Sequence, residues 1–385
     1  MREVEAIITA YEKARAENLG CVLATVVHVE GSSYRRAGAR MLVDEDGLMT
    51  GAISGGCLEG DALRKALHAL HQHKNKLVTY DTSDESDAAI GAQLGCNGVI
   101  QVLFEPIDFQ QNDNPIELLK KANTENESMV IGTYFHLDKT KEQGGTTFLI
   151  DQSLNISGRG KGFDFHNHVL DDCQTAFNDQ TSLFREYLFK DQKQYLFLEV
   201  FTPPPTLVLV GAGNDAQLLA QMAQVLGWSI VVSDGRPTHA NGSRFASSCQ
   251  VIVSKPEEIL DEVQVTNRTV FVLMTHNYRY DLAVLKVLIE KKEIPYIGIL
   301  GPKKKYERML NDMKEKGIAL TDEQLATIHA PVGLEIGAET PAEIGLSILS
   351  EIQSVLTDTE GGRLKEKDGP IHRKKNNEFK QVIIE

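Results

Sequence analysis

The sequence has no long hydrophobic run, no surplus of positive charge and no closely paired cysteines. Because no apolar run approaches the ~20 residues that cross a bilayer, we expect no membrane-spanning segment and no membrane partner. The net charge of −14 at pH 7 should repel polyanions, which argues against a nucleic-acid partner. Five cysteines, an odd number, argue against a disulfide framework or a zinc ribbon. Acidic residues interrupt the first ten positions, so we expect no secretory signal and a cytoplasmic protein.

The chain is too long, at 385 residues, for one ordinary core, which predicts two domains. The best boundary is Pro203–Pro205, because three prolines fix the backbone and withhold their N–H donors. We therefore expect an N-terminal domain over residues 1–200 and a second domain over 205–356. A charged tail over 357–385 should follow, flexible up to about residues 381–384.

The first domain is predicted to have a mixed α+β fold. Apolar residues at helical spacing indicate helices over 3–18 and 58–72, with a short helical pattern at 116–122. Runs rich in β-branched residues predict strands at 21–29, 41–43, 49–53, 78–80, 99–104, 129–135, 146–150 and 195–201, with polar loops between the last three.

The second domain alternates between predicted strands and helices, which is typical of an α/β fold with a Rossmann-like, doubly wound parallel sheet. Strands are expected at 206–210, 229–233, 251–254, 269–274 and 296–299. A final helix should begin after Thr340, because that residue can cap it, Pro341 suits its first position and Glu343 completes a capping box.

A glycine-rich turn follows the first of these strands and opens a helix. Gly211 and Gly213 allow backbone N–H groups to approach a phosphate, and Ala216 stands where the fingerprint tolerates alanine. Asp234 ends the next strand, where a ribose-binding acid belongs. Asp215, however, places a negative charge near the expected pyrophosphate. The turn predicts the fold more firmly than it predicts NAD(P) binding, since such folds host many ligands.

A cysteine lies between glycines just before a predicted helix. Gly55 and Gly56 leave the Cys57 thiol uncrowded, and the dipole of a helix N-terminus favours a reactive thiolate. The alternative is that a tight turn needs a small residue and cysteine simply fits. Glu59 lies in the first turn, where a carboxylate either contacts a ligand or stabilises the helix N-terminus. Cys96 has a similar glycine-flanked setting, and two such thiols suggest one soft-ligand or sulfur-handling site.

A hydroxyl-rich, doubly basic loop precedes that cysteine by about twenty residues. Ser32, Ser33, Arg35, Arg36 and Arg40 together offer donors for a phosphate, which arginine binds through two parallel hydrogen bonds. The alternative is a solvated loop with ordinary surface arginines.

Polar residues also follow the later strands of the second domain. His276, Asp281 and Lys303 come after strands whose carboxyl ends should meet at one crevice, so they are candidate crevice residues. The histidines within residues 68–73 sit at the end of a helix, and interaction with the helix C-terminus explains them without a metal. No metal ligands are therefore assigned.

Taken in order along the chain, these motifs resemble the XdhC/CoxI family. The first domain resembles its N-terminal module at 31–40, 54–59 and 95–96, and the second its Rossmann module at 203–213, 234–237, 275–276, 296–301 and 341–344. The resemblance covers roughly residues 15–105 and 195–355. The middle part, 106–194, matches poorly and is expected to carry partner specificity. Tyr34 stands where the family pattern suggests proline, and Ser54 where it suggests glycine.

The resemblance implies an accessory chaperone for molybdenum hydroxylases such as xanthine dehydrogenase. Such a protein binds molybdenum cofactor, a molybdopterin, supports its sulfuration by a cysteine desulfurase, and delivers it to the hydroxylase apoenzyme. By this resemblance Arg35, Arg36 and Arg40 would hold the phosphate, and Cys57 would lie near the metal or receive sulfur. It implies a maturation factor more than a turnover enzyme.

Two other functions remain open at this point. An NAD(P)-dependent oxidoreductase would use the Rossmann-like domain, with His276 as a proton donor, but would leave the basic loop and Cys57 without a role. A pure interaction protein would bind no small ligand. The sequence also leaves open whether the chain forms a homodimer.

Overall fold

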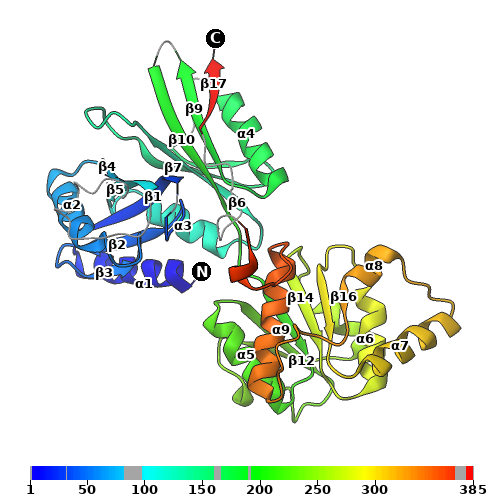
Figure 1. Cartoon of the computed structure of the whole chain (residues 1–385). Helices are drawn as coiled ribbons and strands as arrows, with labels where there is room; N and C mark the ends of the chain where they lie inside the picture. The colour runs from blue at the N-terminus through cyan, green and yellow to red at the C-terminus, as the bar shows by residue number, and fades with distance from the viewer. Residues whose placement is uncertain are drawn as a thin grey trace. The chain divides into compact units, whose positions relative to one another are not determined.

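The computed structural model describes residues 2–31, 33–81, 98–159, 166–189, 192–368 and 379–384. The chain divides into two compact units (Figure 1). Unit 1 comprises Met1–Pro203 together with Asp368–Glu385, and unit 2 comprises Pro204–Lys367. The predicted class, a mixed α/β chain with a parallel sheet in its C-terminal part, is confirmed.

The first sheet of unit 1 is antiparallel, with strand order β3-β2-β1-β5-β4. Its strands are β1 (Cys21–Gly31), β2 (Arg40–Asp44), β3 (Met49–Gly51), β4 (Lys76–Asp81) and β5 (Gly98–Pro106). Alternate residues of β1 enter different apolar clusters. Those on one face pack with α2 (Glu59–Gln72), and those on the other pack with α1 (Arg2–Glu17) and α3 (Pro115–Thr124). Both faces of the sheet are thus covered, which explains why β1 reads as an uninterrupted apolar run.

The second sheet of unit 1 has the order β17-β9-β10-β6-β7-β8. Its strands are β6 (Met129–Phe135), β7 (Gly145–Ile150), β8 (Ile156–Gly158), β9 (Leu183–Phe189), β10 (Gln192–Phe201) and β17 (Lys380–Ile384). The prediction of loops between β7 and β10 was wrong, because β8, β9 and α4 (His166–Asp179) lie there. The sequence of α4 is rich in Asn and Asp, which favour turns over helix interiors. Burial of its apolar side on the sheet decides the conformation.

The end of the chain returns to unit 1. β17 pairs in parallel with β9, from Lys380 opposite Arg185 onwards, at the edge of the sheet (Figure 1). The Phe379 ring lies 4.3 Å from the His28 ring and 4.9 Å from the Tyr195 ring, measured between centroids. The tail was expected to be flexible only up to about residues 381–384, and in the structure Lys380–Ile384 form β17, beside which the half-buried Phe379 ring packs.

Unit 2 contains one parallel sheet of order β13-β12-β11-β14-β15-β16. Its strands are β11 (Thr206–Val210), β12 (Ser229–Asp234), β13 (Gln250–Val253), β14 (Thr269–Leu273), β15 (Tyr296–Ile299) and β16 (Ile328–His329). The chain builds outward from β11 to β13 on one side and from β14 to β16 on the other. The direction therefore reverses between β11 and β14, which is where ligands bind in sheets of this kind.

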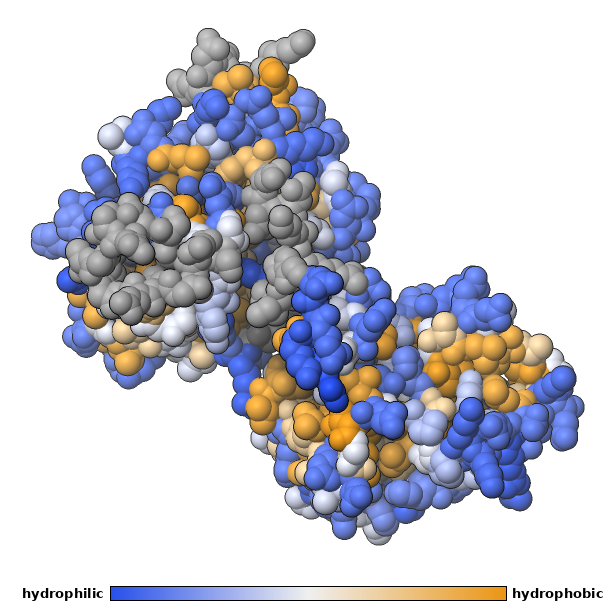
Figure 2. Space-filling view, viewed as in Figure 1, coloured by the Kyte–Doolittle hydropathy of each residue, from blue (hydrophilic) through white to orange (hydrophobic). Residues whose placement is uncertain are grey.

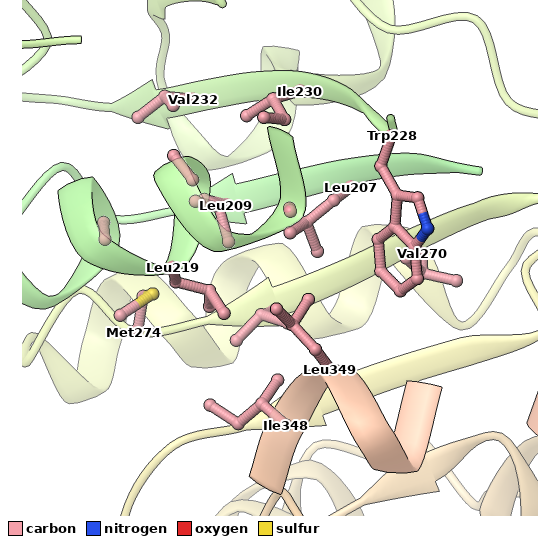
Figure 3. Close-up of a cluster of buried hydrophobic side chains, with 14 of the residues drawn as sticks. Leu207, Leu209, Leu219, Trp228, Ile230, Val232, Val270, Met274, Ile348 and Leu349 are labelled. Carbon is pink, nitrogen blue, oxygen red and sulfur yellow. The ribbon is translucent and has the colours of Figure 1, made fainter. Parts of the chain in front are cut away.

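Helices cover both faces of this sheet. α5 (Asn214–Val225) and α9 (Pro341–Leu356) pack on one face around Trp228, Leu207 and Leu349 (Figure 3). α6 (Tyr278–Leu288) and α7 (Lys303–Glu315) pack on the other, with the short α8 (Asp322–Ala326) beside β16. The capping box predicted for α9 is present, with Thr340 and Glu343 as its members. α7 and α8 were not predicted from the sequence.

Figure 2 shows hydrophilic side chains over most of the displayed face, with apolar side chains in separate groups. Among the described residues, no helix is both long and apolar enough to cross a membrane.

Candidate functional site

Two loops of unit 1 that the sequence analysis singled out lie together. One joins β1 to β2 and carries Tyr34 and Arg35, and the other joins β3 to α2 and carries Gly55. A Cβ atom at Gly55 would lie 3.4 Å from the Cγ and Cδ1 atoms of the Tyr34 ring, so the ring rests directly on this glycine. Glu3 of α1 links the same loops, because its carboxylate accepts hydrogen bonds from the Arg35 guanidinium (3.1 Å) and from the Ala52 N–H (2.8 Å).

The turn around Cys57 is organised by the hydroxyl of Ser54. This oxygen accepts hydrogen bonds from the backbone N–H groups of Gly56 (3.2 Å), Cys57 (3.2 Å) and Leu58 (3.1 Å). It also lies 3.5 Å from the Cys57 Sγ. Ser54 is buried, whereas Gly55 and Gly56 are exposed and Cys57 is half-buried. The thiol is therefore held at the rim of a turn whose inner donors are already bonded.

Glu59 is the first residue of α2 and belongs to the same turn. Its carboxylate accepts from the Ser54 hydroxyl (2.5 Å), the Ser54 N–H (2.9 Å) and the Leu58 N–H (3.1 Å). Burial alone raises the pKa of Glu59, but the hydrogen bonds from Ser54 and Leu58 outweigh it, and the pKa lies below its ordinary value. An ionised carboxylate here stabilises the N-terminus of α2. Glu59 thus shapes the turn that presents Cys57.

The three arginines of the basic loop have different surroundings. Arg36 is exposed, and its guanidinium has no partner among the described residues. Arg35 is bound to Glu3. Arg40 is only 5% exposed and forms an ion pair with Glu199 of β10, while also donating to the Gly38 carbonyl (2.9 Å).

The expectation that Arg40 grips a phosphate needs correction on this geometry. A phosphate would have to displace Glu199 from a buried pair, and separating such a pair is costly. Arg40 instead anchors the loop to β10 through its ion pair with Glu199. Arg36 is left as the cation of this loop that faces solvent without a partner among the described residues.

The remaining candidates of unit 1 are only partly described. The Ser33 hydroxyl is buried and has no hydrogen-bond partner among the described residues. Ser32 and Cys96 lie outside the described residues. Burial raises the pKa of Cys21 to about 12 and likewise that of Cys173 to about 12, so these thiols stay protonated.

Three residues that hold this site were missed from the sequence. Ser54 was noted only as a departure from a glycine run, although it lies five positions from Glu59, close enough in the chain for a local contact to be considered. Glu3 and Glu199 carried no such signal. Their partners lie 32 and 159 positions away, and only the fold brings them together.

The glycine-rich turn of unit 2 lies at the switch point of the sheet. Gly211 has φ of +120°, and a Cβ atom there would lie 2.6 Å from the Met274 carbonyl oxygen, so this position requires glycine. Gly213 caps α5, and a Cβ atom there would have no heavy atom within 4 Å. The turn is therefore closed on its sheet side and open on the other.

A cavity of about 580 Å³ lies beyond the ends of β12, β13 and β14. Its lining includes Asp234, Arg236, Lys255, Glu258 and Tyr280. Asp234 was expected at this place, but Arg236, Lys255 and Tyr280 were not singled out. Arg236 stands two positions after Asp234, so the pair could have been noticed from the sequence.

The other crevice candidates do not line this cavity. His276 is exposed, with its Nε2 4.0 Å from the Asp215 Oδ2, and Lys303 is exposed at the start of α7. Asp281, expected as a crevice residue, is fully buried. It bonds to Lys305 Nζ (2.7 Å) and to the Thr275 hydroxyl (2.5 Å), so it holds α6, α7 and the end of β14 together. Within the described part of the chain, no group of three or more His, Cys, Asp or Glu side chains is placed to hold a metal ion.

Both units of the chain are similar to known proteins. Residues 14–81 match the family described as "XdhC and CoxI family", and residues 207–352 match the "XdhC Rossmann domain". The chain is 32% identical over 333 residues to a probable xanthine dehydrogenase subunit of Bacillus subtilis, covering 86% of this chain and 92% of the relative. The chain belongs to the XdhC and CoxI family. The predicted resemblance is thereby confirmed.

Two further relatives of this XdhC and CoxI family member are informative. "Molybdenum cofactor insertion chaperone PaoD" of Escherichia coli is 23% identical over 87% of this chain and 83% of its own length. A crystal structure described as a xanthine dehydrogenase from Bacillus halodurans superposes with a TM-score of 0.71 at 29% identity, over 91% of this chain and 96% of the other. Both similarities extend over the two units.

Proposed function

We propose that the chain is an accessory chaperone that binds molybdenum cofactor and inserts it into a xanthine dehydrogenase-type molybdenum hydroxylase. Membership of the XdhC and CoxI family and the likeness to an insertion chaperone support this. The observation that carries it is the meeting of the Cys57 turn with the basic loop in unit 1. The partners in this proposal are the hydroxylase apoenzyme and a cysteine desulfurase.

The residues present fit such a cargo. A molybdopterin carries a phosphate, a dithiolene and a metal, and it therefore calls for a cation, shielding and a soft ligand. The exposed Arg36 guanidinium can pair with the phosphate, since arginine presents two parallel donors to its oxygens. The half-buried Cys57 thiol offers a soft sulfur ligand at the rim of the turn. The Tyr34 ring, 71% exposed and resting on Gly55, offers an apolar surface beside it.

Each neighbouring residue then has a positioning role. Ser54 and Glu59 hold the turn that presents the thiol, and Glu3 ties this turn to the basic loop. Arg40 and Glu199 anchor the loop to β10. In this proposal the chain supports sulfuration by holding the phosphate of the cofactor at Arg36. The bound cofactor then stays accessible to the cysteine desulfurase beside the exposed Gly55 and Gly56.

The test is anaerobic incubation of the pure full-length chain with molybdenum cofactor, followed by gel filtration and oxidation of the protein fraction to fluorescent pterin. We expect pterin at near-stoichiometric yield, reduced at least about tenfold by Arg36→Ala or Cys57→Ser. Matched controls are Arg64→Ala on the exposed side of α2 and Cys249→Ser in unit 2, which should retain the cargo. No pterin with the parent chain would refute the proposal, and equal loss in the controls would refute the site.

The competing function, an NAD(P)-dependent oxidoreductase, finds less support. His276, its expected proton donor, lies beside Asp215 and does not line the cavity of unit 2. Substrate-dependent oxidation of NADPH or NADH by the pure chain would restore this function.

A further inference from the structure

The cavity of unit 2 contains an acidic residue, Asp234, at the place where an NAD site has its ribose-binding acid. In many Rossmann-like folds a carboxylate at the end of the second strand accepts hydrogen bonds from the ribose hydroxyls. Asp234 occupies that place at the end of β12. Whether it can act in this way depends on how many of its acceptor positions are free.

The acceptor positions of Asp234 are filled. Its Oδ1 accepts from the Arg236 N–H (2.9 Å) and Arg236 Nε (2.9 Å), and its Oδ2 accepts from the Ala212 N–H (2.9 Å) and Arg236 Nη2 (2.7 Å). An ionised carboxylate has about four lone-pair sites, so these four hydrogen bonds use them all. A ribose diol would find no acceptor on Asp234 unless Arg236 moved away.

Arg236 meanwhile keeps donors for a ligand. Its side chain is 51% exposed and lines the cavity. A guanidinium has five N–H donors, and only those on Nε and Nη2 are bonded within the described residues. The carboxylate behind it holds the guanidinium plane in one orientation, which suits binding of a phosphate through parallel hydrogen bonds.

A second cation lies on the same cavity. Lys255 follows β13 and lines the cavity, with its Nζ 2.8 Å from the Glu258 carboxylate. Both side chains of this pair are at least half exposed, and such pairs are weak. A phosphate dianion can therefore replace Glu258 as the partner of Lys255. The Tyr280 ring closes another side, fixed by its hydroxyl bond to the Ser254 carbonyl (2.7 Å).

We infer that this cavity binds the adenine-side ribose of a nucleotide that carries a 2′-phosphate, the group that distinguishes NADP(H) from NAD(H). It selects against the same ribose without that phosphate. The open side of Gly213 at the start of α5 leaves backbone N–H groups accessible to the rest of such a ligand. This site lies in unit 2 and is independent of the proposed molybdenum-cofactor site in unit 1.

Isothermal titration of the full-length chain with NADPH, NADH, 2′,5′-ADP and 5′-AMP tests the inference. We expect NADPH and 2′,5′-ADP to bind at least about tenfold more tightly than NADH and 5′-AMP, because only the first two offer a phosphate to Arg236 and Lys255. Tight NADPH binding with weak 2′,5′-ADP binding would locate the recognised phosphate elsewhere and overturn the assignment. Equal affinity for NADPH and NADH, or no response to any of the four at millimolar concentration, would also overturn it.

Substitution of the arginine gives a second, reciprocal test. Arg236→Ala should weaken NADPH binding at least about tenfold. It should not weaken NADH binding, because it returns two acceptor positions on Asp234 to the cavity. Arg279→Ala, which removes an exposed arginine of α6 outside the cavity lining, is the matched control. If the Ala variant misfolds by Trp228 fluorescence, Arg236→Gln, which also removes the charge, serves in its place. An unchanged ratio of NADPH to NADH affinity in a folded variant contradicts the inference.

Discussion

The guanidinium of Arg40 forms a buried ion pair with the carboxylate of Glu199, a residue 159 positions further along the chain. Arg40 begins β2 in the first sheet of unit 1, and Glu199 lies on β10 in the second. A Cβ atom at Gly38 would lie 2.6 Å from the Glu199 Oε1, so the basic loop is packed tightly against the same carboxylate. The shape of this loop thus depends on both sheets of unit 1.

Removing one partner of this pair should destabilise unit 1. Glu199→Ala leaves the Arg40 charge buried without its carboxylate, at an expected cost of about 3–5 kcal/mol. Urea unfolding followed by far-UV circular dichroism should show this, while the fluorescence of Trp228, the single tryptophan, should report an unchanged transition of unit 2. Glu12→Gln, which breaks an exposed pair with Lys120, is the control. Equal unfolding curves for parent and Glu199→Ala would contradict the role of the pair.

The pH dependence of unit 1 should carry a contribution from Glu105. Burial raises the pKa of this carboxyl above its ordinary 4.5, and hydrogen bonds from Thr146 oppose the rise only in part. A raised folded pKa means that the folded state binds the proton more tightly, so this contribution is greatest below pH 4.5 and is lost as pH rises through the folded pKa.

Glu105→Gln should therefore flatten the decline of unit 1 stability at rising pH. Urea unfolding at several values between about pH 5 and pH 8 measures how the free energy of unfolding of unit 1 depends on pH. The exposed Glu127→Gln variant should keep the slope of the parent. A Glu105→Gln slope that matches the parent would show that the carboxyl is not responsible.

The hydroxyl of Ser54 should control both the stability of the turn and the reactivity of its thiol. Ser54→Ala leaves the backbone N–H groups of Gly56 and Cys57 without their acceptor, while the Leu58 N–H keeps the Glu59 carboxylate, at an expected cost of about 1–2 kcal/mol. These N–H groups point to the place of the Ser54 oxygen, which lies 3.5 Å from the Cys57 Sγ, and converging N–H groups favour an anion. In a background with Cys96→Ser and Cys249→Ser, the rate of Cys57 modification by Ellman's reagent should rise several-fold. A slower or unchanged rate in the folded variant would count against this account.

The two glycines of the unit 2 turn should respond differently to alanine. Gly211→Ala places a side chain at φ of +120°, which costs about 1–3 kcal/mol before the clash with the Met274 carbonyl is added. Gly213→Ala meets no atom within 4 Å, so it should lose only the preference for glycine over alanine at an N-cap, about 1 kcal/mol or less. Urea unfolding followed by Trp228 fluorescence separates the two, and similar losses for both would contradict the geometry.

Local signals predicted much of the fold. The alternation of strands and helices after Pro205 predicted the parallel sheet, and the capping box predicted the start of α9, because both depend on residues close together in the chain. The prediction failed for α4, whose polar sequence disfavours a helix. There, packing against the second sheet overrides local propensity.

The candidate sites divide in the same way. The sequence by itself determined which side chains are offered, namely Cys57 before a helix, the basic loop and the acid at the end of β12, since glycine spacing and strand ends are local properties. Only the tertiary structure decided which of them are free. It pairs Arg40 with Glu199 and leaves Arg36 exposed. It also occupies the acceptor positions of the Asp234 carboxylate with hydrogen bonds from Arg236. The physical reason is that a charge buried by the fold must find a partner, and that partner can lie anywhere in the chain.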